Sequence, residues 1–283
     1  MPFVLSAGRN IYYERHGQGP AILFAHGAGS NAATWWQQLP VFSAEFTCIT
    51  LDQRCFGRSE APLEEFDLNL FVQDTLAILD HEGIDRVALM GQSLGGMVGL
   101  RLALNHPDRV AAFVACDTSM ALDHPELCAR MAARVTSGHA QSVEQKSLGA
   151  WFLKSHPDRA ALYAQINHFN PSAHRYTRQA WGAAMATLIA PQNVLPMARL
   201  KDVQCPTLLI VGSEDPLVPV SVMAEAQQLI AASELCVIDR AGHSAYFEIP
   251  AEFNARVLQF LRAAAKDTTN WPSASIPSVH NIS

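Results

Sequence analysis

The chain has 283 residues, of which 49% are hydrophobic and 16% are charged, and its formal net charge is −6. This composition is typical of a globular protein with a large buried core and excludes a disordered chain. A negative charge without any basic run argues against nucleic acid and anionic membranes as partners. No apolar run approaches the roughly 18 residues that a membrane span needs, and the N-terminus lacks a signal-peptide pattern.

The six cysteines are scattered along the sequence without any C-x-x-C pair. This spacing favours buried free thiols over a disulfide framework or a metal site. We therefore expect a cytoplasmic protein. The serine chemistry predicted below implies neither a metal nor an organic cofactor.

Short apolar runs that end in Gly, Asp or Ser recur along the chain, and they predict buried parallel strands. They lie at residues 21–27, 46–52, 86–92, 110–117, 206–212 and 234–239. Residues 11–17 alternate instead and fit an antiparallel edge strand. Helical periodicity at 67–81 and 251–264 places helices between and after the strands. Alternating strands and helices predict an α/β fold with a mostly parallel sheet covered on both sides.

The alternation stops after residue 117, and no strand-like run is found between residues 118 and 199. A structureless loop of this length would be unusual, so we predict a helical lid inserted into the sheet. The core then comprises residues 1–117 and 200–265. The tail, residues 266–283, should be poorly structured, although Trp271 could dock it.

The stretch "MGQSLGG" at residues 90–96 follows directly on an apolar run. Its pattern G-x-S-x-G suits an abrupt turn from a strand into a helix, with Ser93 at the apex and its hydroxyl exposed. Ser93 is therefore the candidate nucleophile.

A serine hydroxyl needs a base, and the base needs a third group that orients it. His243, in "DRAGHSAYFEIP", follows a predicted strand directly, where α/β sheets place active groups. Asp215 follows the preceding strand and is the predicted acid, with Asp117 as the alternative. Glu214 is expected to be a solvated loop charge. The order Ser, Asp, His along the chain is that of the α/β-hydrolases.

A tetrahedral intermediate also needs N–H donors for its negative oxygen. We predict the backbone N–H of Leu94, at the start of the helix after the elbow, and that of Ala28, in the Gly-rich loop "HGAGS". His26 in this loop is expected to be structural rather than a second base.

Residues 10–264 resemble the α/β-hydrolase superfamily, in its branch of small esterases, enol-lactonases and carbon–carbon bond hydrolases. The stretches that carry the resemblance are "HGAGS", "LDQRCFGRS", "GQSLGG", "NHPDRV", "VGSEDPLVP" and "AGHSAYFEIP". The resemblance implies that the helical insertion is a lid that shapes the substrate pocket. Most members carry glycine at Cys55, so the loop geometry should differ there. Dehalogenases and epoxide hydrolases of the superfamily use an aspartate where this chain has Ser93.

The leading hypothesis is a serine hydrolase of carboxylic ester or lactone bonds in a small molecule. Hydrolysis of a carbon–carbon bond in a ring-cleavage product, and cofactor-free perhydrolase or haloperoxidase chemistry, remain open because the same triad serves them. A non-catalytic ligand receptor is the alternative from another class. The sequence leaves the oligomeric state open. The candidate pocket residues are Ser30, Trp35, Trp36, Trp151, Phe152, Phe169, Trp181 and Met185.

Overall fold

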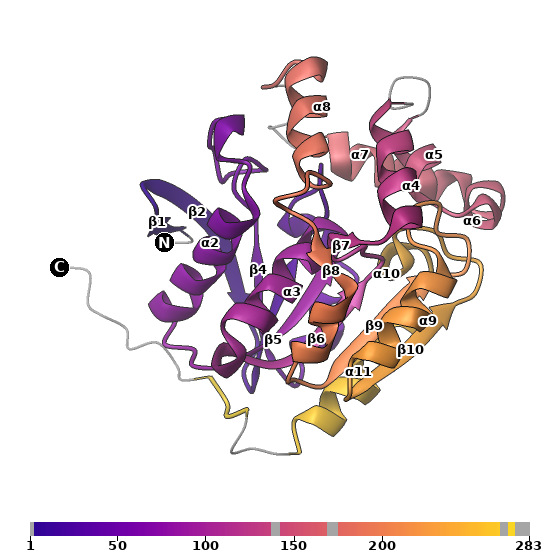
Figure 1. Ribbon diagram of the computed structural model, residues 1–283. Coiled ribbons are helices and arrows are strands. Elements are labelled where there is room, and N and C mark those ends of the chain that lie inside the picture. The colour runs from indigo at the N-terminus through magenta and orange to yellow at the C-terminus, as the bar shows by residue number, and fades with distance from the viewer. Residues whose placement is uncertain (1–2, 137–141, 169–174, 267–270, 275–283) are drawn as a thin grey trace.

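An eight-stranded sheet organises the computed structural model, which describes residues 3–136, 142–168, 175–266 and 271–274 (Figure 1). The strand order is β1-β2-β4-β3-β5-β6-β9-β10. The strands are β1 (Phe3–Ser6), β2 (Arg9–His16), β3 (Ala21–Ala25), β4 (Thr47–Leu51), β5 (Val87–Gln92), β6 (Val110–Cys116), β9 (Thr207–Gly212) and β10 (Ser233–Ile238). From β4 to β10 neighbouring strands run parallel, whereas β1 and β2 pair antiparallel at one edge. The predicted α/β sheet is confirmed.

The central strands are apolar on both faces because each face is covered by helices. In β3, Leu23 and Ala25 join one hydrophobic cluster, while Ile22 and Phe24 join the other. Side chains of a strand alternate between faces, so a fully buried strand supplies both cores.

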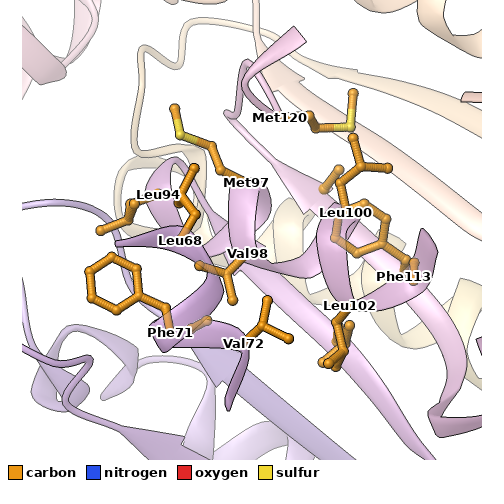
Figure 2. Packing of buried hydrophobic residues seen from close by; sticks show 14 of the residues in the cluster. Leu68, Phe71, Val72, Leu94, Met97, Val98, Leu100, Leu102, Phe113 and Met120 are labelled. Carbon is orange, nitrogen blue, oxygen red and sulfur yellow. The ribbon is translucent and has the colours of Figure 1, made fainter. Parts of the chain in front are cut away.

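Helices α2 (Leu68–His81), α3 (Leu94–Asn105) and α9 (Val220–Leu229) cover the first face. Figure 2 shows side chains of α2 beside those of α3 there, and Phe113 of β6 next to Leu100 of α3. Helices α1 (Leu39–Phe42), α10 (Ala245–Glu248) and α11 (Pro250–Ala264) contribute to the second cluster. Helix α2 begins at its expected place because the Asp67 carboxylate accepts the N–H groups of Asn69 and Leu70. Within the described ranges, no helix has the length and hydrophobicity needed to cross a bilayer.

The described residues between β6 and β9 form five α-helices, and we call residues 118–199 the cap segment (Figure 1). They are α4 (Pro125–Thr136), α5 (Val143–Ser147), α6 (Ala150–Ser155), α7 (Pro157–His168) and α8 (Arg178–Thr187). The segment also contains two strands of two residues, β7 (Leu122–Asp123) and β8 (Leu195–Pro196), which pair in parallel. The prediction of no strand here was wrong, because a pair this short leaves no periodic pattern in the sequence.

The tail is anchored at Trp271. Its side chain is buried, its ring stacks on Phe46 at a centroid distance of 5.7 Å, and its Nε1–H donates to the carbonyl oxygen of Ala21 at 3.1 Å. Ser273 forms a bridge with Pro20. The sequence suggested this docking, and residues 267–270 and 275–283 of the predicted loose tail lie outside the described residues.

The loop after β4 adopts the geometry that glycine usually supplies. Cys55 has a φ of 71°, in the left-handed region that L residues rarely adopt. Its side chain is buried, and burial raises the pKa of its thiol to about 12. This cysteine is therefore an inert packing group. All six cysteines are free thiols, as predicted, and five of them are buried.

Candidate active site

Ser93 stands at the turn between β5 and α3, with a φ of 50°. A Cβ atom at Gly91 would collide with the backbone of Gly95, and one at Gly95 would collide with Ala25 of β3. The two glycines are therefore required by close packing of strand against helix. Cys116 at the end of β6 accepts the Ser93 N–H at 3.0 Å, which fixes the strained residue to the neighbouring strand.

The structure brings the three predicted catalytic side chains into one hydrogen-bonded chain. His243 Nε2 lies 3.0 Å from Ser93 Oγ, and His243 Nδ1 lies 2.9 Å from Asp215 Oδ2. Asp215 Oδ1 accepts the backbone N–H groups of Leu217 at 2.7 Å and Val218 at 3.0 Å. The carboxylate is thus held by its own loop, and Nδ1 is oriented to carry the proton while Nε2 faces the serine.

The backbone of His243 is fixed from two sides. Its N–H donates to the carbonyl oxygen of Ser147 in the cap segment at 2.6 Å, and its carbonyl oxygen accepts Gln92 Nε2 at 2.8 Å. Gln92 immediately precedes the serine, so the strand that carries the nucleophile also positions the base. Sequence reasoning did not single out Gln92, because it occupies a variable position of the G-x-S-x-G pattern.

Glu248 is a buried carboxyl that joins the His243 loop to the cap segment. It accepts the N–H groups of Gly242 at 2.9 Å, Ser244 at 3.2 Å and Gly149 at 2.7 Å. Burial raises its pKa to about 7, against the lowering effect of these three donors. The sequence offered only a weak signal for this role, an acidic residue inside an otherwise apolar stretch.

The alternative acid Asp117 and the neighbouring Glu214 each bind backbone N–H groups outside the triad. Asp117 is buried, and its carboxyl accepts the N–H groups of Gly212 and Ala245, each at 2.9 Å. Burial and then the charge of Asp215 raise its pKa well above the usual range. Through its bonds to Gly212 and Ala245, Asp117 connects the loop of Asp215 to the loop of His243. Glu214 was expected to be merely solvated, but its carboxylate accepts the Trp151 N–H at 2.9 Å in the first turn of α6.

The two predicted oxyanion donors border the same space as Ser93. Leu94 is the first residue of α3, where N–H groups have no partner within the helix. Ala28 lies in a turn closed by the Ser30 N–H and the Gly27 carbonyl oxygen at 3.2 Å, with Gly29 at a φ of 86°. His26 is buried away from this space, because its Nδ1 pairs with the Gly27 oxygen and its Nε2 accepts the Gln53 N–H.

A cavity of about 390 Å³ opens above Ser93 and His243. Of the candidate pocket residues, Ser30, Trp181 and Met185 line it. Trp35 and Trp151 do not, and these two expectations are corrected. Trp35 packs beneath the site, with its ring on Phe24 and Tyr246. Trp151 lies against His156 and Arg240.

Three further pocket candidates lie elsewhere. Trp36 is largely exposed, and Phe152 is buried against Phe247. Phe169 lies outside the described residues. In the part of the chain that the structure covers, no three His, Cys, Asp or Glu side chains are grouped so that they could hold a metal ion.

Comparisons with known proteins identify the family of the chain. A family model described as "alpha/beta hydrolase fold" matches residues 20–250. RutD of Variovorax paradoxus (strain S110), whose name assigns it only provisionally as a carbamate hydrolase, is 33% identical over 264 residues, which are 89% of this chain and 96% of the relative. The 3-oxoadipate enol-lactonase 2 of Acinetobacter baylyi is 28% identical over 87% of this chain and 91% of its own. The solved structure of Est816, described as an N-acyl homoserine lactone degrading enzyme, superposes with a TM-score of 0.78 at 28% identity, over 92% of this chain and 100% of its own.

Proposed function

Since the chain belongs to the alpha/beta-hydrolase fold family, we propose that it is a serine hydrolase that cleaves carboxylic ester or lactone bonds of a small molecule. The observation that carries the proposal is the hydrogen-bonded chain from Ser93 through His243 to Asp215 at the base of the cavity. The lactone-degrading name of one similar structure and the lactonase name of one relative support the choice of bond.

In the proposed acylation, Ser93 Oγ attacks the carbonyl carbon while His243 Nε2 takes the hydroxyl proton. The carbonyl oxygen becomes an oxyanion that accepts the N–H groups of Ala28 and Leu94. Each such donor is worth about 3 kcal/mol in the transition state. The bond to the leaving oxygen then breaks, and His243 returns the proton to the alcohol, which in a lactone stays attached to the acyl chain.

In deacylation, water takes the place of the alcohol. His243 removes a proton from the water, the hydroxide adds to the acyl carbon, and Ser93 leaves with the proton that His243 returns. Asp215 stabilises the imidazolium in both halves of the reaction without itself taking a proton. The products are a carboxylic acid and the free serine.

The test compares wild type with Ser93→Ala on p-nitrophenyl butyrate, a γ-lactone and an aryl carbamate. Wild type should give a burst of one p-nitrophenol per chain and an acyl-enzyme visible by intact mass, and Ser93→Ala should lose both along with roughly 10⁶-fold in kcat. Ser43→Ala, which removes a hydroxyl outside the cavity lining, is the matched control and should behave as wild type. Wild-type rates in Ser93→Ala would overturn the proposal, and turnover of the carbamate alone would reassign the bond.

A further inference from the structure

The side of the cavity formed by the cap segment carries three cationic side chains. Arg134 of α4, Lys146 of α5 and Arg178 of α8 all line it. Among the described residues that line the cavity, none is an aspartate or a glutamate. In the described chain, no carboxylate forms an ion pair with Arg134 or Arg178.

These cations are close enough to one another to interact, and two of them are partly removed from water. Burial lowers the pKa of Lys146, and the charges of Arg134 and Arg178 lower it further. Burial also lowers the pKa of Arg134, while Tyr163 and the nearby carboxylate of Asp215 act in the opposite direction. A cluster of like charges in a partly desolvated space costs free energy that a bound anion would offset.

The guanidinium of Arg134 is also held in place. Nη1 donates to the carbonyl oxygen of Lys146 at 2.5 Å, and Nη2 donates to Ser147 Oγ at 3.3 Å. A planar fork fixed in this way suits a carboxylate, which can accept two N–H groups at once.

The lining also has an apolar component. It includes Met97, Met131, Trp181, Met185, Leu188 and Leu217. A cavity that combines a nucleophile, apolar side chains and a cationic cluster suits a ligand with a reactive carbonyl, an apolar part and an anionic group.

We propose that the substrate carries a carboxylate in addition to its reacting carbonyl, and that Arg134, Lys146 and Arg178 bind this carboxylate. The substrate class is then a half-ester of a dicarboxylic acid, or a lactone with a free carboxylate. This inference rests on the proposed function for the reaction at Ser93, but the anion site itself is independent of that reaction.

The test uses two p-nitrophenyl esters that differ in one charge, mono-p-nitrophenyl adipate and its methyl-capped neutral diester. Wild type should show a kcat/KM at least tenfold higher for the anionic ester, and the preference should shrink as NaCl rises. Lys146→Met and Arg178→Met should each lower the ratio of the two kcat/KM values by about 5- to 10-fold, as expected for loss of a partly solvated charged hydrogen bond. The ratio within one variant cancels any change that affects both esters.

Lys154→Met is the matched control, because Lys154 is an exposed lysine of α6 in the same cap segment but outside the cavity lining. It should keep the wild-type ratio. Arg178 is exposed, so its replacement remains informative if Lys146→Met fails to fold. A wild-type ratio near one, an unchanged ratio in Arg178→Met, or an equal fall in Lys154→Met would overturn the proposal.

Binding to Ser93→Ala separates this inference from the proposed function. Isothermal titration calorimetry should show adipate binding to Ser93→Ala at least tenfold more tightly than the neutral adipamide. Adipate binding without any Ser93-dependent turnover would reject the proposed function and support the anion site. Ser93-dependent turnover with equal binding of adipate and adipamide would reject the anion site and support the proposed function.

Discussion

Replacing Asp215 by Asn should stop proton transfer without moving the triad. The Leu217 and Val218 N–H groups both point at Asp215 Oδ1, so an asparagine there will place its amide oxygen at this position. Its NH₂ group then takes the place of Oδ2, which in wild type lies 2.9 Å from His243 Nδ1. Nδ1 must become the acceptor, the proton moves to Nε2, and Nε2 can no longer accept the proton of Ser93.

The size of the effect follows from this tautomer change. We expect kcat to fall by roughly 10⁴-fold, or about 5 kcal/mol of transition-state stabilisation. Asp117→Asn provides the matched control, because Asp117 accepts the N–H groups of Gly212 and Ala245 rather than orienting the imidazole. Its new NH₂ group will face one of these N–H donors without an acceptor between them. This should lower the free energy of unfolding by about 1–3 kcal/mol. Its kcat should fall by no more than roughly tenfold, the equivalent of 1.4 kcal/mol.

Initial rates of p-nitrophenyl butyrate hydrolysis, with active sites counted by a fluorophosphonate label, measure kcat for each variant. Urea unfolding of the same preparations measures stability. If Asp117→Asn loses more activity than Asp215→Asn, the acid belongs to the strand β6 and the reasoning from the two N–H donors is refuted.

Three further predictions concern a carboxyl, the tail and the cavity. Burial raises the pKa of Glu248 from 4.5 to about 7. Between these two pH values the folded protein holds a proton on Glu248, whereas the unfolded chain releases it. The free energy of unfolding therefore falls as pH rises across this window. The unfolding free energy of wild type minus that of Glu248→Gln should therefore shrink by roughly 2–3 kcal/mol from pH 5 to 7; a gap that stays constant or widens would contradict it. Trp271→Ala should cost about 3–5 kcal/mol of stability in urea with unchanged ester hydrolysis, and a loss below 1 kcal/mol would mean that the tail is not anchored there. Trp181→Ala should re-rank p-nitrophenyl esters of different chain length by about 1–3 kcal/mol in kcat/KM, while Trp151→Ala, outside the cavity, should preserve the wild-type order.

Local patterns in the sequence determined the α/β sheet and the order of its strands along the chain. Runs such as residues 86–92 are apolar on both faces because helices cover both faces, so the pattern predicts buried parallel strands. The elbow was equally readable, since Gly91 and Gly95 are required by contacts within a few residues or with the adjacent strand. Ser93, Asp215 and His243 could be placed together because each follows a parallel strand, and such ends meet at one edge.

Only the tertiary structure decided which side chains face the cavity. Trp35 and Trp181 are both tryptophans in apolar surroundings, yet the first is buried beneath the site and the second lines the cavity. The tertiary structure also decided the role of Glu248, which binds N–H groups of two separate segments. It likewise brought Arg134, Lys146 and Arg178 together from three different helices. Helical periodicity shows which residues share one face of a helix. It does not show what that face packs against, because helix packing in the cap segment depends on contacts between residues far apart in the chain.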